Sequence, residues 1–333
     1  MRVIDTAKRV LGNQAIALGS SAKGRNASDV AKEAMLVRVA GIQMACGEIK
    51  EKNIERAVRL VALAAERGAK IICLQELFHT HWFPKEIDEK NFELAESMGG
   101  PTLHAMQPLA RERQVVLVLP IFEEDGRGTF YNAAVVIDSG GEILGVYRKV
   151  HIPQIPLWEE KSYFSPGNTG FPVFQTSSGR IGVQICWDNF FPEGTRCLTL
   201  KGAQIIFAPT AAAFASQHRW QTMISANAMA NGVFIMRVNR VGSEQKQDFY
   251  GRSFCVGPDG ELRGSPTGMK EGILFADIDL REIPRYRNEY PLLSDRRPPV
   301  YADISDPAVT GLENETTRID HEGEDQNNSG HSS

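Results

Sequence analysis

The stretch "VQICWDNFFPEG", residues 183–194, decides the fold, because an apolar strand ends at Cys186 and a helix begins soon after it. The preceding residues, 181–185, are mostly apolar and β-branched, as in a buried strand. Pro192 and Glu193 then open a segment with helical spacing. At a strand-to-helix turn, backbone N–H groups favour a thiolate and a developing oxyanion. Cys186 is therefore a candidate nucleophile; the alternative is a small buried side chain at a strand end.

Strands and helices alternate on both sides of this segment. We expect strands over 36–44, 70–77, 115–124, 202–210, 233–242 and 253–262, a hairpin over 131–149, and helices over 53–68, 102–113 and 218–232. Early alternation followed by hairpins indicates one mixed α/β domain whose sheets are covered by helices.

Charge divides the chain unevenly. Its 333 residues are 42% hydrophobic, enough for a sizeable core, and carry a net charge of −4. Residues 303–333 contribute −7, which leaves +3 for the rest. A nearly neutral body gives no reason to expect nucleic acid or a membrane surface as a partner. We expect a loosely ordered extension over 1–35, a catalytic domain over 36–302 and a disordered acidic tail over 303–333.

The cysteines and the N-terminus bear on localisation. Five cysteines stand at 46, 73, 186, 197 and 255, without a C-x-x-C pair. No apolar run is near 18 residues long, and the first 35 residues lack the apolar segment of a secretory signal. A transit peptide is the alternative, because this segment holds six Lys/Arg against three Asp/Glu. We expect a cytoplasmic protein whose thiols, apart from Cys186, are inert in apolar surroundings.

Three apolar segments end in a residue that a core strand does not favour. Glu76 ends "IICLQE", Lys149 ends "ILGVYRK" and Cys186 ends "VQIC". Each one alone is compatible with a strand end that reaches solvent. The three together, each with its own flanking pattern, point to a catalytic site.

The flanking sequences resemble the motifs of the nitrilase superfamily, the carbon–nitrogen hydrolases. The matches are "QELF", "YRKVHIP" and "QICWDNFFPE", supported by "FSPGNTGFPVF" (164–174) and "FYGRSF" (249–254), and the resemblance covers 36–302. It implies a four-layer α-β-β-α sandwich and a homo-oligomer, a dimer or a multiple of it. We expect no cofactor. We also expect no metal, because His79 and His81 have no third ligand at a suitable spacing.

The resemblance also implies the roles of the site residues. Cys186 attacks the substrate, and Glu76 serves as base, then acid, then base for water. Lys149 stabilises the oxyanion together with the backbone N–H of Trp187. A second glutamate follows the lysine in this family; Glu160 matches best, and Glu159 is the alternative.

The residues after Cys186 limit the classes of substrate that we expect. Asp188 stands where dedicated nitrilases tend to have Glu, which argues against nitriles. The motifs are most similar to those of N-carbamoylputrescine amidases, so we expect cleavage of an N-carbamoyl amine, foremost N-carbamoylputrescine, to amine, ammonia and CO2. The alternatives are an N-carbamoyl-amino-acid hydrolase, an ω-amidase, a nitrilase, or a catalytically silent relative that binds a small molecule.

The far end of the substrate is expected to be cationic or neutral. Amino-acid-specific relatives often carry arginines where this chain has Asn189 and Phe190, although Arg219 could pair with a carboxylate. The substrate-binding candidates are Trp187, Asp188, His81, Trp82, Trp158, Phe190, Arg219 and Trp220.

Overall fold

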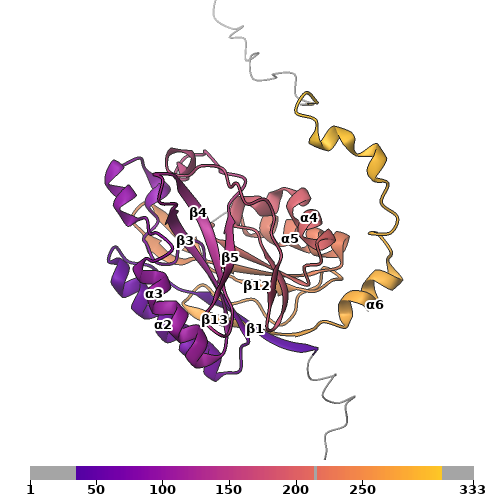
Figure 1. Cartoon of the computed structure of the whole chain (residues 1–333), viewed down its shortest axis with the longest axis horizontal. Coiled ribbons are helices and arrows are strands. Elements are labelled where there is room, and N and C mark those ends of the chain that lie inside the picture. Colours follow the sequence, from indigo (N-terminus) through magenta and orange to yellow (C-terminus); the bar gives the residue numbers. More distant parts are fainter. Residues whose placement is uncertain (1–34, 214–215, 310–333) are drawn as a thin grey trace, which may run out of the picture. The chain divides into compact units, whose positions relative to one another are not determined.

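The computed structural model describes residues 35–213 and 216–309 (Figure 1). They fall into two compact units, divided between Tyr290 and Pro291. The described part of the second unit contains two short 3-10 helices, Pro298–Val300 and Ala302–Ser305. The domain boundaries at 36 and 302 stay predictions, and the extension before 35 and the tail after 309 lie outside the described residues.

The first sheet has six strands in the order β13-β1-β2-β3-β4-β5. They are β1 (Leu36–Gln43), β2 (Ile71–Leu74), β3 (Val116–Glu124), β4 (Phe130–Ile137), β5 (Ile143–Arg148) and β13 (Gly272–Asp279). β1, β2 and β3 are parallel, and the other pairs are antiparallel. The β4–β5 hairpin agrees with the sequence, whereas β13 was not expected and pairs with β1 over its full length.

The second sheet has five strands in the order β12-β9-β8-β7-β6. They are β6 (Phe174–Thr176), β7 (Gly179–Val183), β8 (Ile205–Thr210), β9 (Phe234–Asn239) and β12 (Phe254–Val256). β7, β8 and β9 are parallel, so their carboxyl ends meet at one edge. A separate hairpin joins β10 (Val241–Glu244) to β11 (Gln247–Tyr250).

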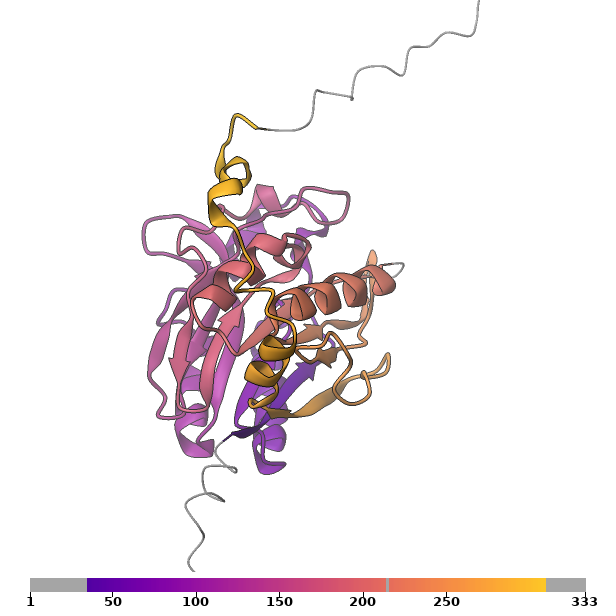
Figure 2. The same ribbon diagram turned by 90° about the vertical axis from the view of Figure 1, so that its right-hand side faces the viewer.

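One helical layer covers the outer face of each sheet. α2 (Lys50–Glu66) and α3 (Pro101–Arg113) share a buried apolar cluster with the first sheet. α4 (Pro192–Leu200) and α5 (Gln217–Asn231) lie on the second sheet, in front of it in Figure 2. α6 (Glu282–Glu289) follows β13. The predicted four-layer α-β-β-α sandwich is confirmed.

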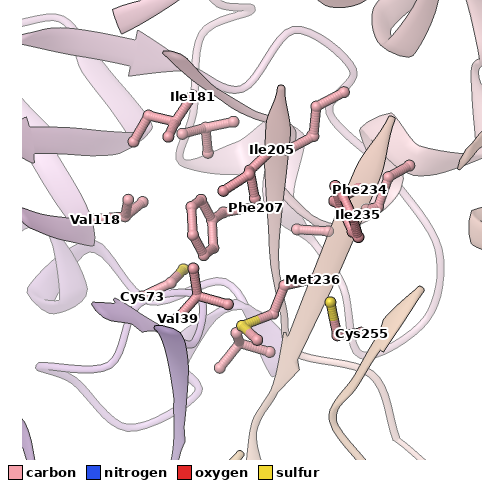
Figure 3. Close-up of a cluster of buried hydrophobic side chains, with 14 of the residues drawn as sticks. Val39, Cys73, Val118, Ile181, Ile205, Phe207, Phe234, Ile235, Met236 and Cys255 are labelled. Atoms are coloured by element: carbon pink, nitrogen blue, oxygen red, sulfur yellow. The ribbon is translucent and has the colours of Figure 1, made fainter. Parts of the chain in front are cut away.

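Apolar side chains from both sheets form the central core. Figure 3 shows Val39, Cys73 and Val118 of the first sheet facing residues of the second, including Phe207 and Met236. The sheets approach closely at Gly41, where a Cβ atom would lie 2.7 Å from a methyl group of Val238. A larger side chain there would separate the layers whose strand ends carry the site.

Short 3-10 helices fill the loops near these strand ends. They are η1 (Phe83–Lys85), η2 (Glu89–Leu94), η3 (Glu160–Ser162) and η4 (Cys186–Phe190). Among the described residues, no helix is long and apolar enough to cross a membrane.

Candidate active site

The structure joins Glu76, Lys149 and Glu160 into one buried ionic cluster. Glu76 follows β2, Lys149 follows β5, and Glu160 begins η3. The Lys149 ammonium donates to Glu76 Oε1 at 2.9 Å and to Glu160 Oε2 at 2.6 Å. All three side chains are shielded from solvent. Glu160, rather than Glu159, therefore contacts the lysine; the half-buried Glu159 accepts a hydrogen bond from Gln154.

One oxygen of Glu76 is left available for proton transfer. Its Oε1 accepts from Lys149 and, at 2.8 Å, from Asn132 Nδ2. Its Oε2 is buried and has no hydrogen-bond partner among the residues that the structure describes. A buried carboxylate oxygen without a donor is costly unless the substrate or the nucleophile supplies one. Glu76 is thus held by one oxygen and can act as a base with the other.

Cys186 lies in a constrained turn at the start of η4. Its backbone φ is +47°, a left-handed conformation that side chains larger than glycine seldom adopt. Asn189 Nδ2 donates to the Cys186 carbonyl at 2.9 Å and fixes the turn from within. Within "CWDN", the side chain of Asn189 thus fixes the backbone of the turn and, through it, the position of the Cys186 thiol.

The Asp188 carboxylate braces the same turn. It accepts from the backbone N–H of Ile185 at 3.0 Å, from Tyr147 Oη at 2.6 Å and from the backbone N–H of His151 at 2.9 Å, and the His151 ring nitrogen Nδ1 lies 2.8 Å away. Asp188 is fully buried, and these contacts occupy both of its oxygens. It therefore connects the cysteine turn to the lysine segment, a different role from the substrate contact expected from the sequence.

Electrostatics keep the resting nucleophile protonated. Burial raises the pKa of the Cys186 thiol well above its usual value, Glu76 raises it further, and Lys149 opposes the effect. The thiolate that the turn was expected to favour is therefore not the resting form. A thiol at this place needs a base at the moment of attack, which agrees with the free oxygen of Glu76.

The two carboxylates maintain the charge of Lys149. Burial alone would lower the lysine pKa, but Glu160 and Glu76 outweigh it and raise that pKa. Burial also raises the pKa of Glu160 to about 7, since the opposing effect of Lys149 does not fully compensate. The cluster consequently holds a fixed cation and takes up one further proton near neutral pH.

A buried arginine, Arg240, binds the backbone at Glu76 and directly after it. Arg240 Nη2 donates to the carbonyls of Glu76 at 3.2 Å and Leu77 at 2.7 Å, and Nη1 pairs with Glu244 at 2.6 Å. The other Glu244 oxygen accepts from the Trp82 N–H. Leu77 has a φ of +50°, so this support stabilises a strained turn directly after the base.

Comparison with known proteins decides the family. Residues 38–288 match the carbon-nitrogen hydrolase family. The chain belongs to this family. The chain is 40% identical to an N-carbamoylputrescine amidase of Solanum tuberosum, over 82% of this chain and 96% of the relative. It is 35% identical to a citrullinase of Francisella tularensis, over 80% of this chain and 98% of the relative.

Solved structures lead to the same family. A crystal structure of a carbon–nitrogen hydrolase from Helicobacter pylori matches with a TM-score of 0.79 at 35% identity, covering 82% of this chain and 99% of the other. The resemblance seen in the motifs is thereby confirmed, as is the fold that it implied.

Three of the aromatic candidates gather at the cysteine turn of this carbon–nitrogen hydrolase. The Phe190 ring lies 5.2 Å from that of Trp187 and 4.6 Å from that of Trp220, measured between centroids. Trp187 and Phe190 are half-buried, whereas Trp220 is buried. The exposed Arg219 precedes Trp220 in α5.

The other aromatic candidates belong to a second cluster, near Glu76. Trp82 is fully buried, donates to the Leu157 carbonyl at 3.0 Å and packs 6.3 Å from Trp158. Trp158 donates to the Ala211 carbonyl at 3.2 Å. Burial lowers the pKa of the neighbouring His81. No group of three or more His, Cys, Asp or Glu side chains within 35–213 and 216–309 is arranged to hold a metal ion.

Sequence reasoning missed Arg237. This side chain is fully buried on β9, in the apolar run "FIMRVN". A charge in the middle of a buried strand was the available signal, because such a residue requires a specific partner. Cys197, by contrast, was expected in apolar surroundings and is exposed on α4.

Proposed function

We propose that this chain hydrolyses the terminal carbamoyl group of an N-carbamoyl amine through a covalent thioester on Cys186. The observation that carries the proposal is the buried Lys149 between Glu76 and Glu160, whose charges all act on the Cys186 thiol. This arrangement combines a protonated nucleophile, a base with a free oxygen and a permanent cation. Such a set suits attack on a poorly electrophilic carbonyl carbon.

Each step of the reaction uses a group of this cluster. Glu76 removes the thiol proton, and the Cys186 sulfur bonds to the carbamoyl carbon. Lys149 and the backbone N–H of Trp187 stabilise the oxyanion. Glu76 then gives its proton to the departing ammonia, which leaves a thioester. Water, deprotonated by Glu76, displaces the sulfur; the carbamic acid that forms releases CO2 and the amine.

N-carbamoylputrescine is the proposed first substrate. The support is the 40% identity to the potato N-carbamoylputrescine amidase over nearly all of that enzyme, together with the motif resemblance in the sequence. The complete Glu–Lys–Cys set argues against a catalytically silent relative, because a protein that only binds has no use for a buried charged cluster of this cost. We propose further that the enzyme is cytoplasmic and forms a homo-oligomer.

Ammonia release tests the proposal. Purified protein is assayed with N-carbamoylputrescine, N-carbamoyl-β-alanine, a simple ω-amide and a nitrile, with Cys186→Ala as the matched inactive control. We expect release from the carbamoyl compounds, none from the nitrile, and none from the alanine variant. Activity confined to amides or nitriles, or retained in Cys186→Ala, would contradict the proposal.

A further inference from the structure

Arg237 is a buried cation whose hydrogen-bonding capacity is largely unused. Its Nη2 donates to Tyr250 Oη at 3.0 Å. Its Nε and Nη1 have no hydrogen-bond partner in the described residues, and no Asp or Glu within these residues acts on its charge. Solvent does not reach the side chain. Buried guanidinium groups in proteins are normally paired, so this unpaired one is a candidate anion-binding group.

Aromatic rings surround the guanidinium group but do not replace the anion. Its central carbon lies 4.8 Å from the ring centroid of Trp220, 5.3 Å from that of Tyr250 and 5.8 Å from that of Phe254. These faces attract a cation. They accept no conventional hydrogen bond, however, and the Nε and Nη1 protons remain unsatisfied. The surroundings therefore stabilise the positive charge and leave its donors free for a ligand.

The register of the second sheet places Arg237 toward the carboxyl edge that carries the nucleophile. Val183 of β7 is level with Phe207 of β8 and with Met236 of β9. Arg237 therefore stands one residue further toward the carboxyl edge, where Cys186 follows β7. Two strand spacings, roughly 10 Å, separate the backbones of β7 and β9.

Trp220 connects the two places directly. Its ring packs on the Arg237 guanidinium group and also, at 4.6 Å, on Phe190 of the cysteine turn. Burial lowers the Arg237 pKa, and Tyr250 and an ionised Cys186 thiolate oppose that effect. Phe190 is half-buried and is the more exposed ring of this pair, so access of an anion to the free donors requires Phe190 and Trp220 to move.

We propose that Arg237 forms an anion subsite for the end of the substrate remote from the carbamoyl group. The ligand class is a ureido acid: a carbamoyl group that reaches Cys186, joined by a short chain to a carboxylate that accepts from Arg237. This inference rests on the proposed function and adds ureido acids to its substrates, which departs from the sequence-based expectation of a cationic or neutral far end. Arg237 would pair with the substrate carboxylate. Asn189 and Phe190 carry no charge and cannot do so, and the exposed Arg219 was the earlier candidate for this role.

A matched pair of substrates tests the charge preference. 4-Ureidobutyrate and N-carbamoylputrescine have similar length and carry opposite charges at the far end. We expect Arg237→Met to lower the ratio of their kcat/KM values, ureido acid over carbamoyl amine, by about tenfold or more. Arg67→Met, at an exposed arginine after α2, controls for the loss of one positive charge. An unchanged ratio, or a fall that follows Arg219→Met instead, would overturn the proposal.

Ligand binding without turnover separates this inference from the proposed function. In a Cys186→Ala background, 4-ureidobutyrate should raise the melting temperature of the protein with Arg237 and not of the protein with Arg237→Met. Met at this place removes an unpaired charge from the core, so the variant itself should be at least as stable. Equal stabilisation of both proteins would refute the subsite. A failure of wild-type turnover alone would refute the carbamoyl chemistry and leave this binding test intact.

Discussion

Replacing Glu160 by glutamine should remove a pH dependence of stability that the buried cluster creates. Burial raises the pKa of Glu160 from 4.5 to about 7. Between these values the folded protein keeps a proton that the unfolded chain has lost. The free energy of unfolding must therefore fall as the pH rises through this interval. The difference corresponds to about 3 kcal/mol if the group titrates alone.

Urea denaturation at pH 5, 6, 7 and 8, at one protein concentration, measures this effect. The wild-type free energy of unfolding should decline toward pH 7. Above that pH the contribution of Glu160 should no longer change. A glutamine side chain cannot titrate, so Glu160→Gln should show a flatter profile. The amide oxygen of the glutamine can still accept from Lys149, which makes the variant a mild change of shape.

Catalysis should respond separately. In the Glu160→Gln variant, Lys149 keeps only Glu76 as an anionic partner, and its orientation toward the oxyanion is less constrained. We expect kcat to fall by about 100-fold, the typical cost of a disturbed oxyanion donor, with little change in KM. Identical pH profiles of stability for the two proteins would refute the assignment of the proton to Glu160, and an undiminished kcat would refute its positioning role.

Three further predictions concern the nucleophile, the ion pair and the tail. Cys186→Ala should abolish turnover and leave the melting temperature unchanged within about 2 °C. Because Cys197 is exposed and would also react, alkylation of Cys186 should be measured by mass spectrometry in a Cys197→Ser background. Substrate should protect the Cys186 thiol from alkylation. Glu76→Gln and Lys149→Met should each cost nearly as much kcat/KM as the double variant, because the residues act as one device; two modest losses that simply add would show that one role is wrong. Deleting 306–333 should leave kcat/KM within about twofold, because this acidic segment has too little apolar surface to fold alone; a collapse of activity would mean that it supports the site or the oligomer.

The sequence predicted the parts of the site that lie at strand ends. Glu76, Lys149 and Cys186 each interrupt an apolar run, and a polar residue at such a place is visible without any structure. Strand ends of this fold meet at one edge, so the sequence alone was enough to predict that the three residues lie close together. The choice between Glu159 and Glu160 could not be made in this way, because adjacent residues of a short 3-10 helix point in different directions.

Other features depended on contacts that no local pattern contains. Asp188 follows the nucleophile and was expected to face the substrate, yet its two oxygens hold Ile185, Tyr147 and His151. The pairing of β13 with β1 joins segments more than 200 residues apart, and its sequence alone does not reveal its partner. Arg237 was visible as a charge within an apolar strand, but its free donors were not.

The charges of the site explain why its members depend on one another. A buried thiolate beside two carboxylates would be strongly disfavoured, and the raised pKa of Cys186 reflects this. Transfer of the thiol proton to Glu76 creates the thiolate and neutralises the nearer carboxylate in the same step, so the total charge of the cluster does not change. Above the Glu160 pKa of about 7, Lys149 keeps an anionic partner throughout, because the Glu160 carboxylate stays beside it when Glu76 is protonated. Glu160 therefore allows Glu76 to exchange protons without releasing the cation that the oxyanion needs.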